Sequence, residues 1–208
     1  MRTGEKIPVV GLTGCPGSGK TLVASMLGEY GARIVDVDEA GRWAVDNHAD
    51  VRRRLSAAFG ADIFADDGNL DRRTLGALVF ADPEKLARLN EIVHPVMLAR
   101  VRRLIREAEE PDVPYIVLDA ALIFELSLDR VADVTVTVDA PFEVCAGRIR
   151  QRNGLTTGEI KARFRAQLPR EIKKKRAEYV IVNRGDLGQL QRKVEKLHAW
   201  LVDRLKRD

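Results

Sequence analysis

The chain has 208 residues, of which 45% are apolar and 32% are charged. This balance is sufficient to bury a core and argues against intrinsic disorder, so one globular domain with room for an inserted subdomain is expected. No apolar run approaches the roughly 18 residues that a membrane-spanning helix needs, and a formal net charge of +4 is too small to indicate a nucleic-acid partner. We therefore expect a cytoplasmic protein that binds neither membrane nor nucleic acid. Two cysteines are too few for a disulfide framework or a four-thiolate zinc site.

Short runs of β-branched and aliphatic residues predict five strands. They lie at residues 9–12, 34–35, 115–118, 134–138 and 180–182. None alternates throughout with charged or strongly polar residues, which is typical of strands buried on both faces in a parallel sheet covered by helices. Helical periodicity follows the first strand at residues 22–27 and is clearest after the last, where leucines together with Val194 recur at steps of three and four over residues 187–205.

The connections between the strands have very different lengths. Between the second and third strands we predict only helices, at residues 51–59, 71–80, 83–93 and 95–110. This is more helix than one crossover needs, so residues 59–110 are predicted to form a helical subdomain. The arginine-rich stretch 141–176 is predicted to be a helical lid. Residues 7–58, 111–140 and 177–208 would form the core of the single domain.

A glycine-rich loop follows the first predicted strand and matches the pattern G-x-x-x-x-G-K-[ST] at every fixed position. Its residues are Gly14, Cys15, Pro16, Gly17, Ser18, Gly19, Lys20 and Thr21. Glycines let the backbone N–H groups approach phosphate oxygens, and the helix that follows points its N-terminus at the same anion. Lys20 can neutralise the β- and γ-phosphates, and the Thr21 hydroxyl can hold Mg²⁺. With Leu22 behind it, this loop predicts a site for a nucleoside triphosphate.

Several classes of protein share this loop, and two of them lack support in the sequence. There is no Asn-Lys-x-Asp segment of a GTPase and no Leu-Ser-Gly-Gly-Gln segment of a transporter ATPase. Small-molecule kinases remain, and in them an arginine-rich lid keeps water away from the γ-phosphate. A nonenzymatic ATP-binding module, whose arginines dock a protein or RNA, is the alternative.

Two acids follow the second predicted strand, Asp36 and Asp38. Ligands of open α/β sheets bind beyond the carboxyl ends of the strands, so these acids should face the phosphate loop. Asp38 could accept the proton of a hydroxyl nucleophile. Asp36 is interpreted mainly as the cap of a helix that begins near Glu39.

The ordered set of motifs resembles the dephospho-CoA kinase family over nearly the whole chain. The matching segments are Gly11-Leu12-Thr13-Gly14 through Lys20, Asp36-Val37-Asp38, Gly68-Asn69-Leu70-Asp71-Arg72-Arg73, His94-Pro95, Leu122-Ile123-Phe124-Glu125, Arg148, Gln151-Arg152-Asn153, Gln167-Leu168-Pro169, Lys173 and Asn183-Arg184-Gly185. Ala121 stands where the family usually has proline. The resemblance implies a three-layer α/β/α P-loop kinase with a five-stranded parallel sheet, a helical substrate-binding insertion and a helical lid.

The resemblance also implies a reaction and roles for individual residues. ATP, with Mg²⁺, would phosphorylate the ribose 3′-hydroxyl of dephospho-CoA to give CoA and ADP. Asp38 would be the base, Arg152 with Arg148 would stabilise the transferring phosphoryl group, and Asn183 would lie near the adenine. Contacts with dephospho-CoA are implied for Asp38, Arg42, Leu70, Asp71, Arg72, Arg73, His94, Pro95 and Leu122, and residues 59–110 would bind CoA. Packing alone explains His94 about as well, and a nucleoside, a nucleotide or a sugar acid is the alternative acceptor.

Overall fold

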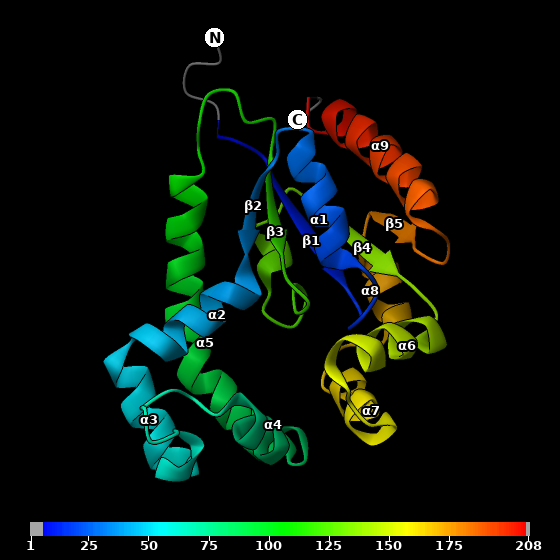
Figure 1. Cartoon of the computed structure of the whole chain (residues 1–208). Coiled ribbons are helices and arrows are strands. Elements are labelled where there is room, and N and C mark those ends of the chain that lie inside the picture. Colours follow the sequence, from blue (N-terminus) through cyan, green and yellow to red (C-terminus); the bar gives the residue numbers. More distant parts are fainter. Residues whose placement is uncertain (1–5, 207–208) are drawn as a thin grey trace. The chain divides into compact units, whose positions relative to one another are not determined.

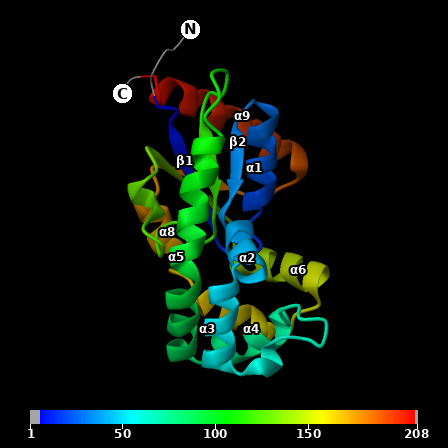
Figure 2. The same cartoon turned by 90° about the vertical axis from the view of Figure 1, so that its left-hand side faces the viewer.

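The structure is a computed structural model that describes residues 6–206 (Figures 1 and 2). By its internal contacts the chain divides into two compact units. The first contains the residues up to Asp36 and those from Ile105 onward, and the second runs from Val37 to Leu104. The range 59–110 predicted for binding CoA therefore starts inside the second unit, and its function stays a prediction.

A five-stranded sheet forms the centre of the first unit. Its strands are β1 (Val9–Gly14), β2 (Arg33–Asp36), β3 (Ile116–Asp119), β4 (Val134–Asp139) and β5 (Tyr179–Val182). Their order is β2-β3-β1-β4-β5, and every neighbouring pair is parallel. The register pairs Leu12 with Asp119 and Gly14 with Val138. The predicted parallel sheet is thus confirmed, and β1, β3 and β4 are buried along their whole lengths.

Helices cover both faces of this sheet. On one face, α1 (Lys20–Glu29) and α9 (Leu187–Arg204) pack against each other and share an apolar core with alternate residues of β1 and β4, such as Val10 and Val136. Because successive side chains of a strand point to opposite faces, Thr13 and Thr135 point to the other face. There α8 (Arg170–Arg176) contacts β1 and β4, and Thr135 Oγ1 donates to the Arg176 carbonyl at 3.5 Å.

The stretch predicted as a lid contains α8 and two further helices, α6 (Phe142–Asn153) and α7 (Thr157–Arg165). Gly154 ends α6 with φ 65°. A capping box then starts α7, in which Thr156 Oγ1 accepts the Glu159 N–H while the Glu159 carboxylate accepts the Thr156 N–H. The helical character of this stretch is confirmed, whereas its motion as a lid remains a prediction.

The second unit is helical. It contains α2 (Val37–Asn47), α3 (Ala49–Phe59), the 3-10 helix η1 (Ala61–Ile63), α4 (Arg72–Phe80) and most of α5 (Pro83–Glu107).

One boundary predicted from the sequence was wrong here, and another differs by two residues. The helix expected near Glu39 begins at Val37, directly after Asp36, the last residue of β2. The two helices expected on either side of His94 form the single helix α5 with Pro95 inside it. Proline removes one N–H donor but does not prevent the flanking turns from continuing the helix. In residues 6–206, no helix is both long and apolar enough to cross a membrane.

Candidate functional site

The loop between β1 and α1 needs glycine where its backbone turns. Gly17 and Gly19 have φ values of 77° and 96°, a region that side chains with a Cβ rarely adopt. A Cβ on Gly14 would come within 2.5 Å of Ser18 Oγ and 2.6 Å of the Val138 carbonyl oxygen. The loop then leads directly into α1 at Lys20, so the N-terminus of this helix faces the loop and favours an anion there.

Two side chains distant in sequence donate hydrogen bonds to the carbonyl oxygens of this loop. Asn183, which follows β5, donates from Nδ2 to the Ser18 carbonyl at 2.7 Å, and it is 5% exposed. Arg148 of α6 donates from Nη1 to the Gly17 and Ser18 carbonyls at 3.3 and 3.2 Å. Because both donors bind carbonyl oxygens, neither competes with phosphate for the N–H groups of the loop, of which that of Ser18 donates to the Cys15 carbonyl at 3.0 Å.

Lys20 forms an ion pair with Asp119, the last residue of β3. The Lys20 side chain is 10% exposed and that of Asp119 is 3% exposed, so the pair is largely shielded from water. Because β3 lies next to β1 in the sheet, Asp119 at the end of β3 is close to the loop that follows β1. The ion pair therefore holds the Lys20 ammonium group beside the phosphate loop. No pattern in the sequence indicated this pairing, which joins residues 99 positions apart.

The chemistry of Thr21 and Asp119 fits Mg²⁺. Thr21 is in the first turn of α1 next to Lys20, and hydroxyl and carboxylate oxygens are ligands that Mg²⁺ accepts. Among residues 6–206, no group of three or more His, Cys, Asp and Glu side chains could hold a metal ion.

Arg152 does not share the position of Arg148. It lies four residues later in α6, is exposed, and donates from Nε to Asn153 Oδ1 at 3.0 Å. In this structure Arg148 is thus at the phosphate loop and Arg152 is not among the side chains that contact it.

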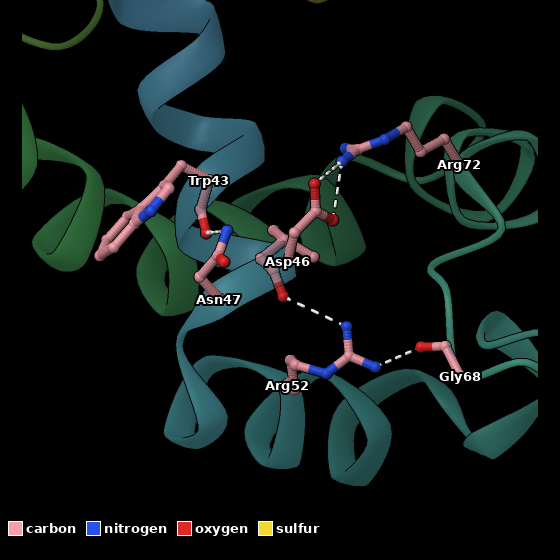
Figure 3. Close-up of polar contacts among 7 residues, drawn as sticks. Trp43, Asp46, Asn47, Arg52, Gly68 and Arg72 are labelled. Carbon is pink, nitrogen blue, oxygen red and sulfur yellow. Dashed lines mark hydrogen bonds and ion pairs between the residues drawn. The ribbon is translucent and has the colours of Figure 1, made fainter.

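Three of the charged residues of the second unit lie on one face of α2, because Asp38, Arg42 and Asp46 are spaced by four residues. Asp46 extends this face to α4. Its two carboxylate oxygens accept hydrogen bonds from Arg72 Nη2 at 2.9 and 2.8 Å (Figure 3). The predicted acceptor residues Asp38, Arg42 and Arg72 therefore belong to one connected surface of the second unit.

A clamp by Arg52 orders the loop that leads to Arg72 (Figure 3). The Arg52 guanidinium donates to the Gly68 carbonyl and, at 3.5 Å, to the Val45 carbonyl, and it stacks 4.6 Å from the centre of the Phe64 ring. It thereby joins α3 to the end of α2 and to the loop. The sequence prediction missed Arg52, which stands in a run of three arginines, 52–54, with nothing to distinguish its members.

The loop itself holds two further residues of the predicted acceptor side, directly before α4 begins at Arg72. Leu70 forms a β-bridge with Phe64, and Asp71 caps α4 by accepting the N–H groups of Arg73 and Thr74, both at 3.0 Å. The Thr74 hydroxyl hydrogen bond, followed by these backbone bonds, lowers the pKa of the Asp71 carboxyl. Asp71 thus has a structural function in the cap. The exposed Arg73 follows it on the first turn of α4.

His94 and Pro95 lie within α5, and burial lowers the pKa of the half-buried His94. Leu122 lies in the turn after β3, in the first unit, where its carbonyl accepts the Leu126 N–H at 2.9 Å. These three residues were predicted to contact dephospho-CoA, and this remains a prediction.

Comparison with known proteins gives consistent matches. A family model described as dephospho-CoA kinase matches residues 8–189. A curated dephospho-CoA kinase of Streptomyces avermitilis is 40% identical over 94% of this chain and 94% of its own length. One of Corynebacterium glutamicum is 37% identical over 94% of this chain and 98% of its own length.

Solved structures agree with these matches. A crystal structure from Thermus thermophilus matches with a TM-score of 0.76 at 36% identity, covering 95% of this chain and 99% of that one. A dephospho-CoA kinase from Campylobacter jejuni has a TM-score of 0.67 at 20% identity, covering 94% and 97%, and supports the fold.

Proposed function

The chain belongs to the dephospho-CoA kinase family, and we propose from this premise how its residues share the work of the reaction. The protein is a kinase that transfers the γ-phosphoryl group of ATP to the ribose 3′-hydroxyl of dephospho-CoA, the last step of coenzyme A biosynthesis. The observation that carries the residue assignments is the structure of the phosphate loop. Asn183 and Arg148 hold its carbonyl oxygens, and Lys20, at its end, forms an ion pair with Asp119.

The donor side binds ATP through the loop at residues 14–21. Its N–H groups and the start of α1 contact the phosphates, and Lys20 exchanges part of its contact with Asp119 for the β- and γ-phosphates. Thr21, with Asp119, would hold Mg²⁺, which neutralises phosphate charge when bound. Asn183 supports the loop, and its position beside the loop is compatible with an additional contact to the nucleotide.

The acceptor side is proposed to be the face of α2 with the adjoining loop. Asp38 orients the 3′-hydroxyl and accepts its proton. Arg42 and Arg72 contact the anionic part of dephospho-CoA, and Asp46 keeps the Arg72 guanidinium at the edge of this face. Leu70, Arg73, His94, Pro95 and Leu122 are proposed to complete the binding of dephospho-CoA.

The lid is proposed to act on the transferred group. Arg148 and Arg152 are both on α6, so a movement of this helix would bring both guanidinium groups towards the γ-phosphate and keep water out. We propose the cytoplasm as the compartment of the reaction, because Cys15 and Cys145 are buried free thiols, as expected in a reducing environment.

A panel of acceptors tests the substrate assignment. ADP release is measured with dephospho-CoA, adenosine, AMP, shikimate and gluconate at equal concentrations. We expect kcat/KM for dephospho-CoA to exceed that for every other acceptor by at least about a hundredfold. A higher value for any of the other acceptors would overturn the assignment, and salt-sensitive RNA binding without ADP release would favour a nonenzymatic module.

A further inference from the structure

Within residues 6–206, Lys173 is the most deeply buried charged residue, with 1% exposure. It lies in α8, on the face of the sheet opposite α1 and α9. Its ammonium group donates to the Ala121 carbonyl at 2.6 Å and to Gln167 Oε1 at 3.0 Å, and it pairs with Glu125 Oε1 at 3.4 Å. Three oxygen atoms therefore match the three N–H donors of the ammonium group.

The partners of Lys173 are themselves connected to other segments. The same Glu125 Oε1 accepts the Leu168 N–H at 2.7 Å. The Ala121 carbonyl also accepts from Thr13 Oγ1 at 3.0 Å, and Thr13 is the residue before the phosphate loop begins. One buried cation thus joins three segments: the end of β1, the turn after β3, and the stretch between α7 and α8 at the exit of the predicted lid.

The placement of this junction matters for the reaction. The turn after β3 begins directly after Asp119, the partner of Lys20. At its other end the junction holds Gln167 and Leu168, which follow the α7 helix. A shift at Lys173 would consequently be passed both to the strand end that carries the ion pair of Lys20 and to α7, which contacts α6, the helix that carries Arg148 and Arg152.

Simple stabilisation is a weak explanation for a lysine in this position. Burial lowers the pKa of Lys173, because the charged form loses its hydration, and the neighbouring Glu125 only partly opposes this effect. Buried ion pairs frequently add no more stability than apolar side chains of the same volume. A methionine would fill the same space, but it could not hold three oxygen atoms in one fixed arrangement.

We propose that Lys173 is a positioning residue for phosphoryl transfer: its ammonium group fixes the turn after β3 against the phosphate loop and ties the lid exit to that turn. The proposal deepens the kinase function and rests on it. Lys173 touches no reacting atom. It acts through Ala121, Glu125 and Gln167, and hence on the geometry of the residues that these segments carry.

The test compares Lys173→Met with Lys173→Arg and with Lys174→Met. Lys174 is the matched control, because it is the next residue of α8, is 32% exposed and pairs with Glu171 at 3.0 Å. The readouts are kcat and KM for ATP and for dephospho-CoA, with kcat counted per folded enzyme well below the melting temperature. We expect Lys173→Met to lower kcat at least about tenfold while both KM values change less than about threefold. Lys173→Arg should recover a measurable part of kcat, and Lys174→Met should match the wild type.

The experiment distinguishes a failure of this proposal from a failure of the proposed kinase function. If wild-type protein does not phosphorylate dephospho-CoA, the kinase function is wrong. If it does, and Lys173→Met has a kcat within twofold of wild type, Lys173 only stabilises the fold and the proposal is overturned. Should Lys173→Met not fold, Glu125→Gln decides. It keeps an acceptor for the Leu168 N–H but removes the charge opposite Lys173, so kcat should fall severalfold, and an unchanged kcat would overturn the proposal.

Discussion

Asn183→Ala tests whether the phosphate loop depends on support from its carbonyl side. The substitution removes the Nδ2 donor that reaches the Ser18 carbonyl at 2.7 Å. The Asn183 amide also packs so closely on Gly19 that a Cβ at this glycine would clash with the same nitrogen. Shortening Asn183 to alanine therefore leaves an unfilled space next to Gly19. Arg148 remains as a second donor to the Ser18 carbonyl, at 3.2 Å. The loop is thus weakened without losing every partner of its buried oxygen.

The expected magnitude follows from this geometry. Removing one donor from a buried carbonyl that keeps another destabilises the ordered loop by about 1 to 2 kcal/mol. This corresponds to a factor of about 5 to 30 in an equilibrium constant. Since ATP binds only the ordered loop, we expect the Kd for ATP to rise by up to that factor. The melting temperature should fall by about 2 to 8 °C, as expected for a chain of this size.

Calorimetric titration measures this effect with ATP and with inorganic tripolyphosphate. If Asn183 acts through the loop, both ligands lose affinity by the same factor. If it acts on the adenine, as the family resemblance implies, only ATP loses affinity. Asn47→Ala is the control, because Asn47 is exposed in α2 and its Nδ2 donates only locally, to the Trp43 carbonyl at 3.2 Å. An unchanged Kd for both ligands would refute the reasoning.

Three further predictions concern the acceptor side and the histidines. Asp38→Asn should lower kcat by about a hundredfold or more and leave the calorimetric Kd for ATP unchanged; undiminished turnover would remove Asp38 from the mechanism. Arg52→Leu should raise the KM for dephospho-CoA severalfold but not that for ATP, whereas Arg53→Leu, which loses only an exposed pair, should change neither; equal effects of both would refute the clamp. Burial lowers the pKa values of His94 and His198, so the unfolded state binds protons that the folded state does not. The free energy of unfolding from urea melts should therefore be lower at pH 5.5 than at pH 7.5, and His94→Gln with His198→Gln should reduce that difference.

Local patterns in the sequence were enough to predict the parallel sheet and the phosphate loop. Short runs rich in β-branched and aliphatic residues predicted all five strands to within a few residues, because strands covered by helices on both faces, as β1, β3 and β4 are, carry few charged residues inside the run. The loop was equally clear, since its turns require glycine at Gly17 and Gly19 and its helix must start beside the phosphate.

Helix boundaries were harder to predict, and the cause is tertiary structure. Pro95 is a strong breaking signal, yet α5 continues through it, with the neighbouring Ile92 and Val93 buried. Apolar burial along a long helix outweighs the loss of one hydrogen bond. In the same way the start of α2 at Val37 could not be told from the sequence, in which Asp36 and Asp38 are equally good caps.

The supporting side chains of the site were largely invisible in the sequence. Arg52 lies in a run of basic residues in which every member has the same chemistry, and Lys173, although it matches a motif of the family, also lies in such a run, which gives no sign of its role. Only the fold decides that Lys173 is buried against Ala121 while its neighbour Lys174 is partly exposed. Long-range partners of this kind have no periodic or spacing signal, because they join residues far apart in the chain.

The central claim is that the protein phosphorylates the 3′-hydroxyl of dephospho-CoA. The most direct measurement offers ATP with either dephospho-CoA or its 3′-deoxy analogue and identifies the product by mass spectrometry, with Lys20→Ala as the inactive control. We predict that dephospho-CoA gains one phosphoryl group in step with ADP release, that the deoxy analogue gains none, and that Lys20→Ala gives neither product at a comparable rate. A phosphorylated deoxy analogue, or no phosphorylation of dephospho-CoA by the wild-type enzyme, would contradict the account.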